Sequence, residues 1–203
     1  MKHPADHRPH RRTALVTGVV AATLLLAGCG GSGAGHSVTH GATGTTAPHN
    51  AADVAFATEM IPHHRQAVAM AQLVIDRGTT PAVQAVAQRI KAAQDPEITI
   101  LGGFLTVFGQ PVPMAGMDMS HGGHAATGMM SAEEMKQLEK ASGKALEKSF
   151  LEMMVRHHQG AIDMSATEVR DGTYRPAREL ATAIRTAQTA EIGQLKALLA
   201  QLR

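Results

Sequence analysis

The sequence repeats one histidine-containing motif. Residues 56–70 read FATEMIPHHRQAVAM, and residues 150–164 read FLEMMVRHHQGAIDM. At this offset of 94 residues, the window 56–105 aligns with 150–199 without a gap. The aligned identities are Phe56/Phe150, Met60/Met154, His63/His157, His64/His158, Ala67/Ala161, Met70/Met164, Gly78/Gly172, Ala87/Ala181, Ile90/Ile184, Ala93/Ala187, Gln94/Gln188, Glu97/Glu191, Ile98/Ile192, Leu101/Leu195 and Leu105/Leu199. Because composition alone does not produce this many identities at one offset, the chain contains two copies of one unit.

Each copy has the pattern of a helical hairpin. The predicted helices cover 51–75 and 81–108 in the first copy and 144–170 and 176–202 in the second, with a short helix at 132–141. Two antiparallel hairpins that each bury an apolar face predict an all-α fold, a four-helix bundle. The scarcity of aromatic residues (no Trp, one Tyr, four Phe) also suits close-packed helices.

Local signals set the expected ends of these helices. Asn50 is the expected N-cap of the first helix, and Gly78 follows its C-terminus. SAEE at 131–134 has the spacing of a capping box. Pro62 and Pro96 lie inside helical patterns, where we expect them to kink or locally open the helices.

The N-terminus has the features of a bacterial export signal. Three arginines (Arg8, Arg11 and Arg12) precede an apolar run at 14–27 that is too short for a comfortable membrane span. The run ends in LAGC at 26–29, which resembles a lipobox and makes Cys29 the predicted lipidation site. The alternative is a buried helix that ends in a glycine turn. We therefore predict an extracytoplasmic protein that is lipid-anchored to the membrane.

The predicted organisation follows from these segments. It comprises a signal peptide (1–29), a flexible Gly/Ser/Thr/Ala tether (30–49) and a bundle domain (50–203), in which repeat 1 spans 50–109, a connector 110–130 and repeat 2 131–203. Lys and Arg number 19 against 17 Asp and Glu. Without a basic patch interleaved with aromatic residues, nucleic acid is not an expected partner.

The repeated motif places polar and sulfur-containing side chains on an apolar helix face. On a helical wheel, Met60, His63, His64, Ala67 and Met70 share the face that must point inward, and the second copy repeats this arrangement. Burying adjacent histidines is costly unless they have partners. Those partners are either a metal ion or the polar residues of the second helices, Gln94, Glu97, Gln188 and Glu191.

The ligand types favour copper over other metals. Thioether sulfur selects Cu(I), and imidazole accepts Cu(I), Cu(II), Zn(II) or Ni(II). The single cysteine is assigned to the anchor, so a thiolate zinc site is excluded. The Glu-x-x-His pattern of di-iron bundles is absent. The predicted ligands are Met60, His63, His64, Met70, Met154, His157, His158 and Met164, with Glu97, Glu191, Gln94 and Gln188 as ligands or as hydrogen-bond partners of ligands.

The connector contains a second group of soft ligands. Met114, Met117, Met119, His121 and His124 follow no helical or strand period, and Met129 and Met130 come shortly after. Packing poorly explains methionines that are expected to be exposed, whereas a flexible Met/His array can wrap a soft cation. We therefore predict an accessory metal site here. The alternative is a linker that is rich in methionine without a metal-binding role.

The motif sequences resemble a known family. FATEMIPHHRQAVAM and FLEMMVRHHQGAIDM look like the two signature segments of the domain of unknown function 305 family, and QDPEI at 94–98 and QTAEI at 188–192 look like its second-helix pattern. The resemblance covers about 50–202. It implies a ferritin-like four-helix bundle and copper binding, since characterised relatives are envelope copper-binding proteins. The connector is not part of the family pattern.

Three functions are compatible with these observations. The favoured one is a lipoprotein that sequesters copper or exchanges it with a donor or acceptor protein of the envelope. The enzyme alternative, which is less favoured, is a Cu(I) or Fe(II) oxidase in which Glu97 or Glu191 is the base. The third is a structural or interaction bundle with a buried network of His and Glu.

Overall fold

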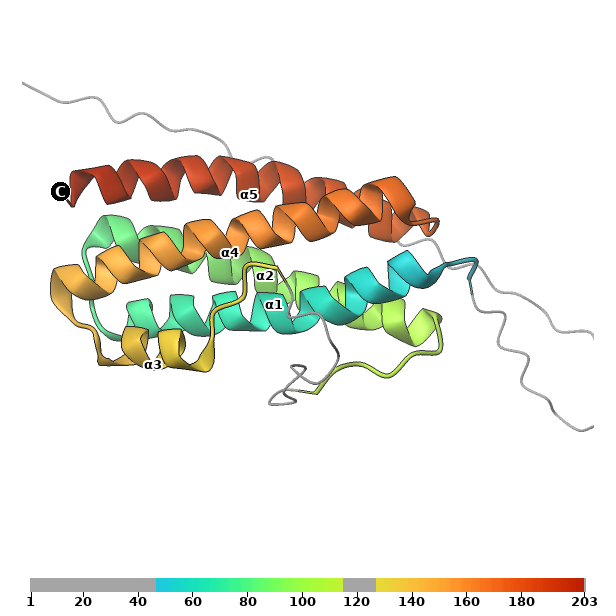
Figure 1. Cartoon of the computed structure of the whole chain (residues 1–203), viewed down its shortest axis with the longest axis horizontal. Helices are drawn as coiled ribbons and strands as arrows, with labels where there is room; N and C mark the ends of the chain where they lie inside the picture. Colours follow the sequence, from blue (N-terminus) through green and yellow to red (C-terminus); the bar gives the residue numbers. More distant parts are fainter. Residues whose placement is uncertain (1–46, 115–126, 203) are drawn as a thin grey trace, which may run out of the picture. The chain divides into compact units, whose positions relative to one another are not determined.

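The computed structural model describes residues 47–114 and 127–202, and this part of the chain is all helical. Its helices are α1 (Ala51–Asp76), α2 (Pro81–Val107), α3 (Ala132–Lys140), α4 (Gly143–Asp171) and α5 (Arg175–Gln201) (Figure 1). Every predicted helix is present, with each end within one residue of its predicted position. The predicted signal peptide and most of the tether lie outside the described residues, as does the middle of the connector.

The helix ends follow the capping signals of the sequence. The Asn50 side chain accepts hydrogen bonds from the backbone at the start of α1, and the Asp53 carboxylate accepts one from the Asn50 N–H in return. Ser131 and Glu134 form the predicted capping box of α3. Gly78 follows the last turn of α1 with φ at +65°, a conformation that favours glycine.

The prolines inside α1 and α2 do not open these helices. Pro62 and Pro96 were expected to kink or locally open them, yet both helices are continuous through these residues. Because neither helix is interrupted, the prediction that these prolines locally open them is wrong. Each proline removes one hydrogen bond, but tertiary packing supplies most helical stability, and both neighbours of Pro62, Ile61 and His63, are fully buried.

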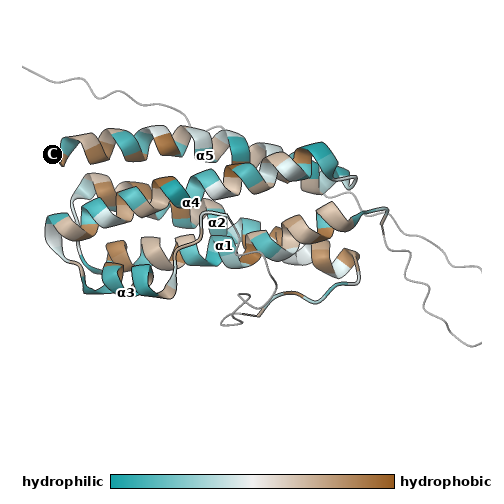
Figure 2. Cartoon of the chain, viewed as in Figure 1, coloured by the Kyte–Doolittle hydropathy of each residue, from teal (hydrophilic) through white to brown (hydrophobic). Residues whose placement is uncertain are grey.

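The four long helices form a bundle in which α1 and α4 are neighbours, α2 packs on α1, and α5 packs on α4 (Figure 1). Hydrophobic and hydrophilic residues are interspersed along each helix (Figure 2), and the buried apolar side chains form two clusters. One hydrophobic cluster joins the first halves of α1 and α5 to the second halves of α2 and α4. The other joins the complementary halves. Hence α1 and α5 run in one direction, and α2 and α4 run in the other.

These directions give the bundle a ferritin-like topology. Because α2 ends at the opposite end of the bundle from the start of α4, the chain between them has to return along its length. One long crossover of this kind distinguishes ferritin-like bundles from simple up-and-down bundles. The predicted fold of two duplicated hairpins in a ferritin-like bundle is therefore confirmed.

Repeat-related carboxylates close the two ends of the bundle. Asp53 on α1 accepts hydrogen bonds from the N–H groups of Thr173 and Tyr174, just before α5. Glu147, at the equivalent position on α4, accepts one from the N–H of Thr80, just before α2, at 2.6 Å. Each hairpin thus caps the second helix of the other hairpin, and these bonds fix the two copies in register.

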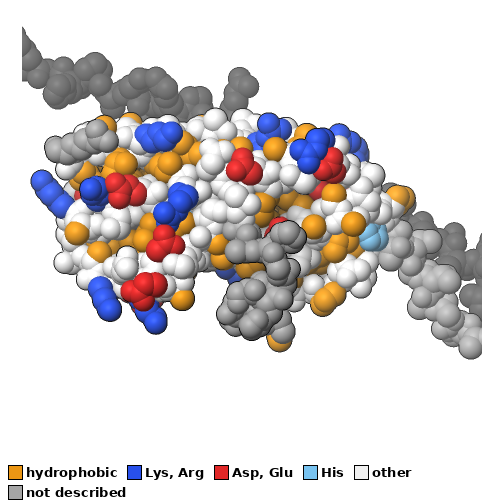
Figure 3. Space-filling view, in the orientation of Figure 1, with side chains coloured by type: hydrophobic (Ala, Val, Ile, Leu, Met, Phe, Trp, Pro, Cys, Tyr) orange, Lys and Arg blue, Asp and Glu red, His pale blue; other side chains and the backbone are white. Residues whose placement is uncertain are grey.

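The surface carries charges of both signs. Figure 3 shows Lys and Arg interspersed with Asp and Glu on the visible face. The exposed large apolar side chains among the described residues are Ile100, Val107, Val112 and Met114, at the end of α2 and the start of the connector. None of the helices in the described ranges has the length and apolar character that crossing a membrane requires.

Candidate metal centre

A polar layer separates the two hydrophobic clusters, and all four long helices contribute to it. It comprises His63 and His64 on α1, Gln94 and Glu97 on α2, His157 and His158 on α4, and Gln188 and Glu191 on α5. In every helix these residues lie between those that enter one cluster and those that enter the other. The four imidazoles are fully buried, as the helical wheel predicts. We call this set the histidine layer.

Two of the four imidazoles are held by glutamates of the partner helix. His64 Nε2 lies 2.7 Å from Glu97 Oε2, and His158 Nε2 lies 2.6 Å from Glu191 Oε2. A carboxylate accepts, so each Nε2 carries the proton and donates it. In both rings the other nitrogen, Nδ1, is buried and has no hydrogen-bond partner among the described residues, and in the neutral form of the ring it carries the lone pair. Metal-ligating histidines commonly donate their other N–H to a carboxylate in this way.

The other two imidazoles bring the two copies into contact. The ring centroids of His63 and His157 lie 3.7 Å apart. His63 Nε2 donates to the carbonyl oxygen of Thr127 at 3.1 Å. The other ring nitrogen of His63, Nδ1, is therefore the unprotonated one, and it has no hydrogen-bond partner in the described structure. Burial, reinforced by the neighbouring His64, lowers the pKa of His63 to about 3, so this ring is neutral at physiological pH.

His157 is the one layer histidine without a fixed acceptor. Within the described residues, neither of its ring nitrogens has a well-formed hydrogen bond. Burial, followed by the proximity of His63, His158 and His64, holds the pKa of His157 well below its usual range. Its ring is therefore neutral and can present either nitrogen to a ligand.

The thioethers flank the histidine layer and belong to the adjoining apolar clusters. Met60, Met70 and Met154 are fully buried, whereas Met164 is half-buried. Met60 and Met164 belong to the cluster on one side of the layer, and Met70 and Met154 belong to the cluster on the other. The structure therefore brings the predicted imidazoles together and places the predicted sulfur ligands above and below them.

The two glutamines behave differently from the glutamates. Gln94 and Gln188 are almost fully buried, but within the described residues neither forms a hydrogen bond with a histidine. Both amide atoms of Gln94 and the carbonyl oxygen of Gln188 lack partners in the described part of the chain. Only the glutamates, one helical turn further on, reach the imidazoles. Of the four second-helix residues expected as hydrogen-bond partners of the histidines, the two glutamates form such bonds in the described structure.

The chemistry of this donor set fits a soft or borderline cation. In the ranges 47–114 and 127–202, no three His, Cys, Asp or Glu side chains are arranged as a ready-made metal-binding group. The layer instead offers buried, unpartnered imidazole nitrogens, with thioethers on either side. Orphaned buried polar atoms need an explanation. Neutral imidazole together with thioether is the ligand set that copper accepts.

The connector differs in part from its prediction. Met114 is exposed at 64% of its surface, while Met117, Met119, His121 and His124 lie outside the described residues. Met130, which was expected to be exposed, is 4% exposed and packs in a hydrophobic cluster. Its backbone is anchored by the Gln66 amide, which directs the Met130 side chain into the core. Packing therefore explains Met130.

Sequence reasoning missed several residues that contact the layer or its neighbours. Thr127 was not singled out, although its carbonyl binds His63, and neither was Gln66. Gly160, the repeat equivalent of Gln66, lies in direct backbone contact with Thr127 and Gly128. A glycine inside a helical pattern, where the other copy has a large residue, was the available signal of a close backbone approach.

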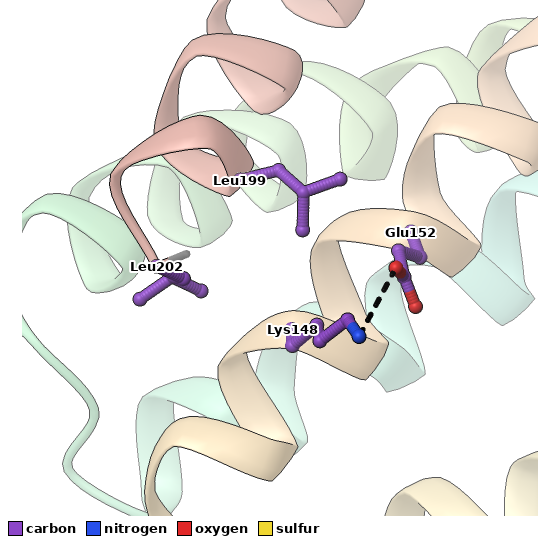
Figure 4. A pocket seen from close by; sticks show the side chains of 4 residues that line it. All are labelled: Lys148, Glu152, Leu199 and Leu202. Atoms are coloured by element: carbon purple, nitrogen blue, oxygen red, sulfur yellow. Dashed lines mark ion pairs between the residues drawn. The ribbon is translucent and has the colours of Figure 1, made fainter.

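A small pocket lies between α4 and α5, away from the histidine layer. Lys148, Glu152, Leu199 and Leu202 line it (Figure 4). Lys148 and Glu152 form an ion pair at 3.9 Å, and both side chains are more than half exposed. The pocket offers an exposed ion pair and two leucines, so the buried donors of the layer are the better candidate site.

Comparison with known proteins identifies the family. Residues 53–199 match the family described as domain of unknown function DUF305. The chain belongs to the DUF305 family. This confirms the resemblance of the two histidine motifs and of the second-helix pattern. A comparison with curated proteins finds no match.

Solved structures of other proteins share this fold. A DUF305 protein from Streptomyces coelicolor, described as secreted, is 32% identical over 74% of this chain and 93% of its own, with a TM-score of 0.67. A DUF305 fragment from Deinococcus radiodurans is 28% identical over 76% and 99%, with the same TM-score. CopM in its Cu(II)-bound form is 27% identical over 74% and 97%, with a TM-score of 0.63. CopM has also been solved in a Cu(I)-bound form.

Proposed function

We propose that this DUF305 protein is an extracytoplasmic copper-binding protein whose two repeats share one site at the histidine layer. CopM supports the metal, since its structures hold Cu(I) and Cu(II). The Streptomyces coelicolor relative, described as secreted, supports the location. The proposed task is sequestration or transfer of copper.

The observation that carries this proposal is the meeting of four buried imidazoles from two copies at one level of the bundle. A lone buried histidine is satisfied by an ordinary hydrogen bond. Here three rings donate through Nε2 to fixed acceptors and keep a buried Nδ1 without a partner among the described residues, and the fourth, His157, has no well-formed hydrogen bond there at either nitrogen. A bound cation would supply the missing partner for these nitrogens.

Different residues of the protein would have different roles in binding copper. His63, His64, His157 and His158 would provide imidazole nitrogen for either oxidation state. The buried Met60, Met70 and Met154, with half-buried Met164, would provide thioether sulfur for Cu(I). Glu97 and Glu191 would hold the tautomer of their histidines and offset the charge of the cation.

Attachment to the membrane completes the proposal. The LAGC sequence at 26–29 supports lipidation of Cys29 after cleavage of the signal peptide. A chain anchored in this way would exchange copper with a donor or acceptor protein of the envelope. Incorporation of labelled fatty acid into the wild type, and its loss in Cys29→Ser, is the expected result; equal labelling of both would disprove the anchor.

The site is tested by removing one imidazole from each copy. In His63→Ala/His157→Ala, Cu(I) affinity measured by competition with a coloured chelator is expected to fall by more than about 100-fold. This expectation rests on the 10–100-fold that a single outer hydrogen-bond partner of a ligand is worth. The control is His49→Ala, because His49 stacks on Phe108 and lies outside the layer. Unchanged affinity in the double variant would disprove the site.

Two other functions make different predictions in the same preparation. An oxidase would consume oxygen when Cu(I) or Fe(II) is added, and Glu97→Gln/Glu191→Gln would stop this uptake. A purely structural network of His and Glu would leave the melting temperature unchanged when metal is added. A specific ligand raises it according to concentration over Kd. Copper binding without oxygen uptake, together with a higher melting temperature, is the expected outcome.

A further inference from the structure

The segment Thr127–Met130 contacts both α1 and α4 beside the histidine layer, and we call it the strap. On the α1 side, the Gln66 side chain holds Met130 at both of its backbone polar groups. Gln66 Nε2 donates to the Met130 carbonyl at 2.9 Å, and the Met130 N–H donates to Gln66 Oε1 at 2.7 Å. This paired contact fixes the C-terminal residue of the strap on α1.

On the α4 side, two glycines let the strap backbone touch the helix backbone. A Cβ at Gly160 would lie 1.7 Å from the Thr127 carbonyl oxygen. A Cβ at Gly128 would lie 2.8 Å from the Arg156 carbonyl oxygen, and Gly128 has φ at +84°. Only glycine fits either position without movement of the chain. Because Gly160 and Gln66 are repeat equivalents, the strap is held between matching positions of the two copies.

These contacts place the Thr127 carbonyl on His63. The carbonyl oxygen can only accept, so the Nε2 atom of His63, 3.1 Å away, carries the proton. Because this ring is neutral, its Nδ1 is the unprotonated nitrogen. The Nε2 atoms of His64 and His158 have the same role as donors, with Glu97 and Glu191 as the acceptors. The Thr127 carbonyl therefore accepts the hydrogen bond from His63 Nε2, as Glu97 and Glu191 accept those from His64 and His158.

We propose that the strap makes His63 an Nδ1 ligand, and that Gln66 and Gly160 are positioning residues that hold the Thr127 carbonyl on Nε2. This inference rests on the proposed copper function. It gives the layer three imidazoles of fixed tautomer and one adaptable imidazole, His157. The second-helix glutamates accept from two of the histidines, and the Thr127 carbonyl in the strap accepts from a third.

Gly160→Ala tests the proposal with little change to the helix. The new methyl group has to displace the strap, because the backbone of Thr127 and Gly128 occupies its position. Alanine itself favours the helical conformation. Gly193→Ala is the matched control, since Gly193 also lies inside a long helix and has open space at its Cβ position. Gln66→Ala is a second variant, which releases the strap from α1.

The first readout is the ¹⁵N signature of the His63 ring in the metal-free full-length protein. The wild type and Gly193→Ala are expected to show one protonated nitrogen at Nε2 and one bare nitrogen at Nδ1. Gly160→Ala and Gln66→Ala are expected to show averaged signals of mixed tautomers. An unchanged His63 signature in both strap variants would overturn the proposal.

The second readout is affinity for Cu(I), followed through the imidazole signals of the layer. Loss of the fixed tautomer is expected to weaken binding by about 10–100-fold in Gly160→Ala and to leave Gly193→Ala unchanged. Mixed tautomers with wild-type affinity would show that the strap has no role in binding. If Cu(I) leaves the imidazole signals of the wild type unchanged, the copper function itself fails, and this result is separate from the tautomer result.

Discussion

The centre of the bundle and its two ends use the duplicated sequence differently. At the centre, both copies keep the same residues, and each glutamate pairs with its histidine at nearly the same distance. At the ends, the carboxylates Asp53 and Glu147 are equivalent in position but not in type. Glu168 lies at the same end of the bundle as Asp53. Its repeat equivalent, at the end with Glu147, is Val74.

The end at Asp53 is the more polar one. Burial alone would raise the pKa of Asp53, but hydrogen bonds from the backbone of Asn50 and Tyr174 lower it below its ordinary value. Burial, together with the neighbouring Asp53 carboxylate, raises the pKa of Glu168 to about 8. Gly172 leaves room for this side chain, because a Cβ there would lie 2.3 Å from Glu168 Oε1.

The end at Glu147 is simpler. Val74 is fully buried among apolar residues, and Glu147 receives one backbone hydrogen bond there, from Thr80. Its second carboxylate oxygen has no partner in the described part of the chain. Gly78, the equivalent of Gly172, serves a different purpose, since its positive φ ends α1.

This contrast follows from where the copies touch. The repeat-equivalent carboxylates Asp53 and Glu147 lie at opposite ends of the bundle, so a change at one of them leaves the surroundings of the other unaltered, and nearby residues can compensate. In the layer, His63 contacts His157 directly, so a change in one copy alters the environment of both. The layer is therefore the part of the bundle in which the two copies have to match.

The largest expected difference between the ends is in stability. Asp53→Ala removes the acceptor of the N–H groups of Asn50, Thr173 and Tyr174. We expect a loss of about 3 kcal/mol in the free energy of unfolding. Glu147→Ala removes one such bond, so its expected loss is about 1 kcal/mol. Urea unfolding measures both, and equal losses would contradict the assigned difference between the ends.

The centre is expected to respond symmetrically. Glu97→Gln and Glu191→Gln each replace a charged acceptor of a layer histidine. Both are expected to weaken Cu(I) binding by about 10–100-fold, to the same extent within a factor of about three. Glu179→Gln on the exposed face of α5 is the control. A loss confined to one of the two layer variants would show that the copies do not contribute equally.

The sequence predicts the fold and the family because both depend on regular patterns. The repeat offset, the apolar periodicity and the caps at Asn50 and Ser131 place every described helix within one residue. The same periodicity predicts that His63 and His157 point inward. Burial of these imidazoles therefore follows from local sequence alone.

The contacts made by the crossover do not follow from local sequence. Nothing in the residues near Thr127 indicates that its carbonyl meets His63, because that contact depends on how the chain returns along the bundle. The burial of Met130 has the same origin. The pairing of Asp53 with the start of α5 likewise joins residues about 120 positions apart in the sequence.

The pH dependence of stability offers a finer test of the end at Asp53. Glu168 faces the negative charges of Asp53 and Asp171, while Arg178 opposes them. Its folded pKa of about 8 lies above the ordinary value of 4.5 that it takes in the unfolded chain. The folded state therefore holds the proton while the unfolded state loses it. Stability is expected to fall as pH rises from about 4.5 to about 8 and to show no further loss from this group above that range.

Glu168→Gln removes the titratable carboxyl group of Glu168 and keeps every other titratable side chain. At pH 4 its stability is expected to equal that of the wild type, because both side chains are then neutral. At pH 8 we expect it to be more stable by about 1–3 kcal/mol, since the buried charge is absent. Urea midpoints measured from pH 4 to pH 9 give the comparison, with Glu139→Gln on the exposed surface of α3 as the control. Parallel pH profiles for the wild type and Glu168→Gln would show that Glu168 titrates normally, and the electrostatic difference between the two ends would then rest on Asp53 alone.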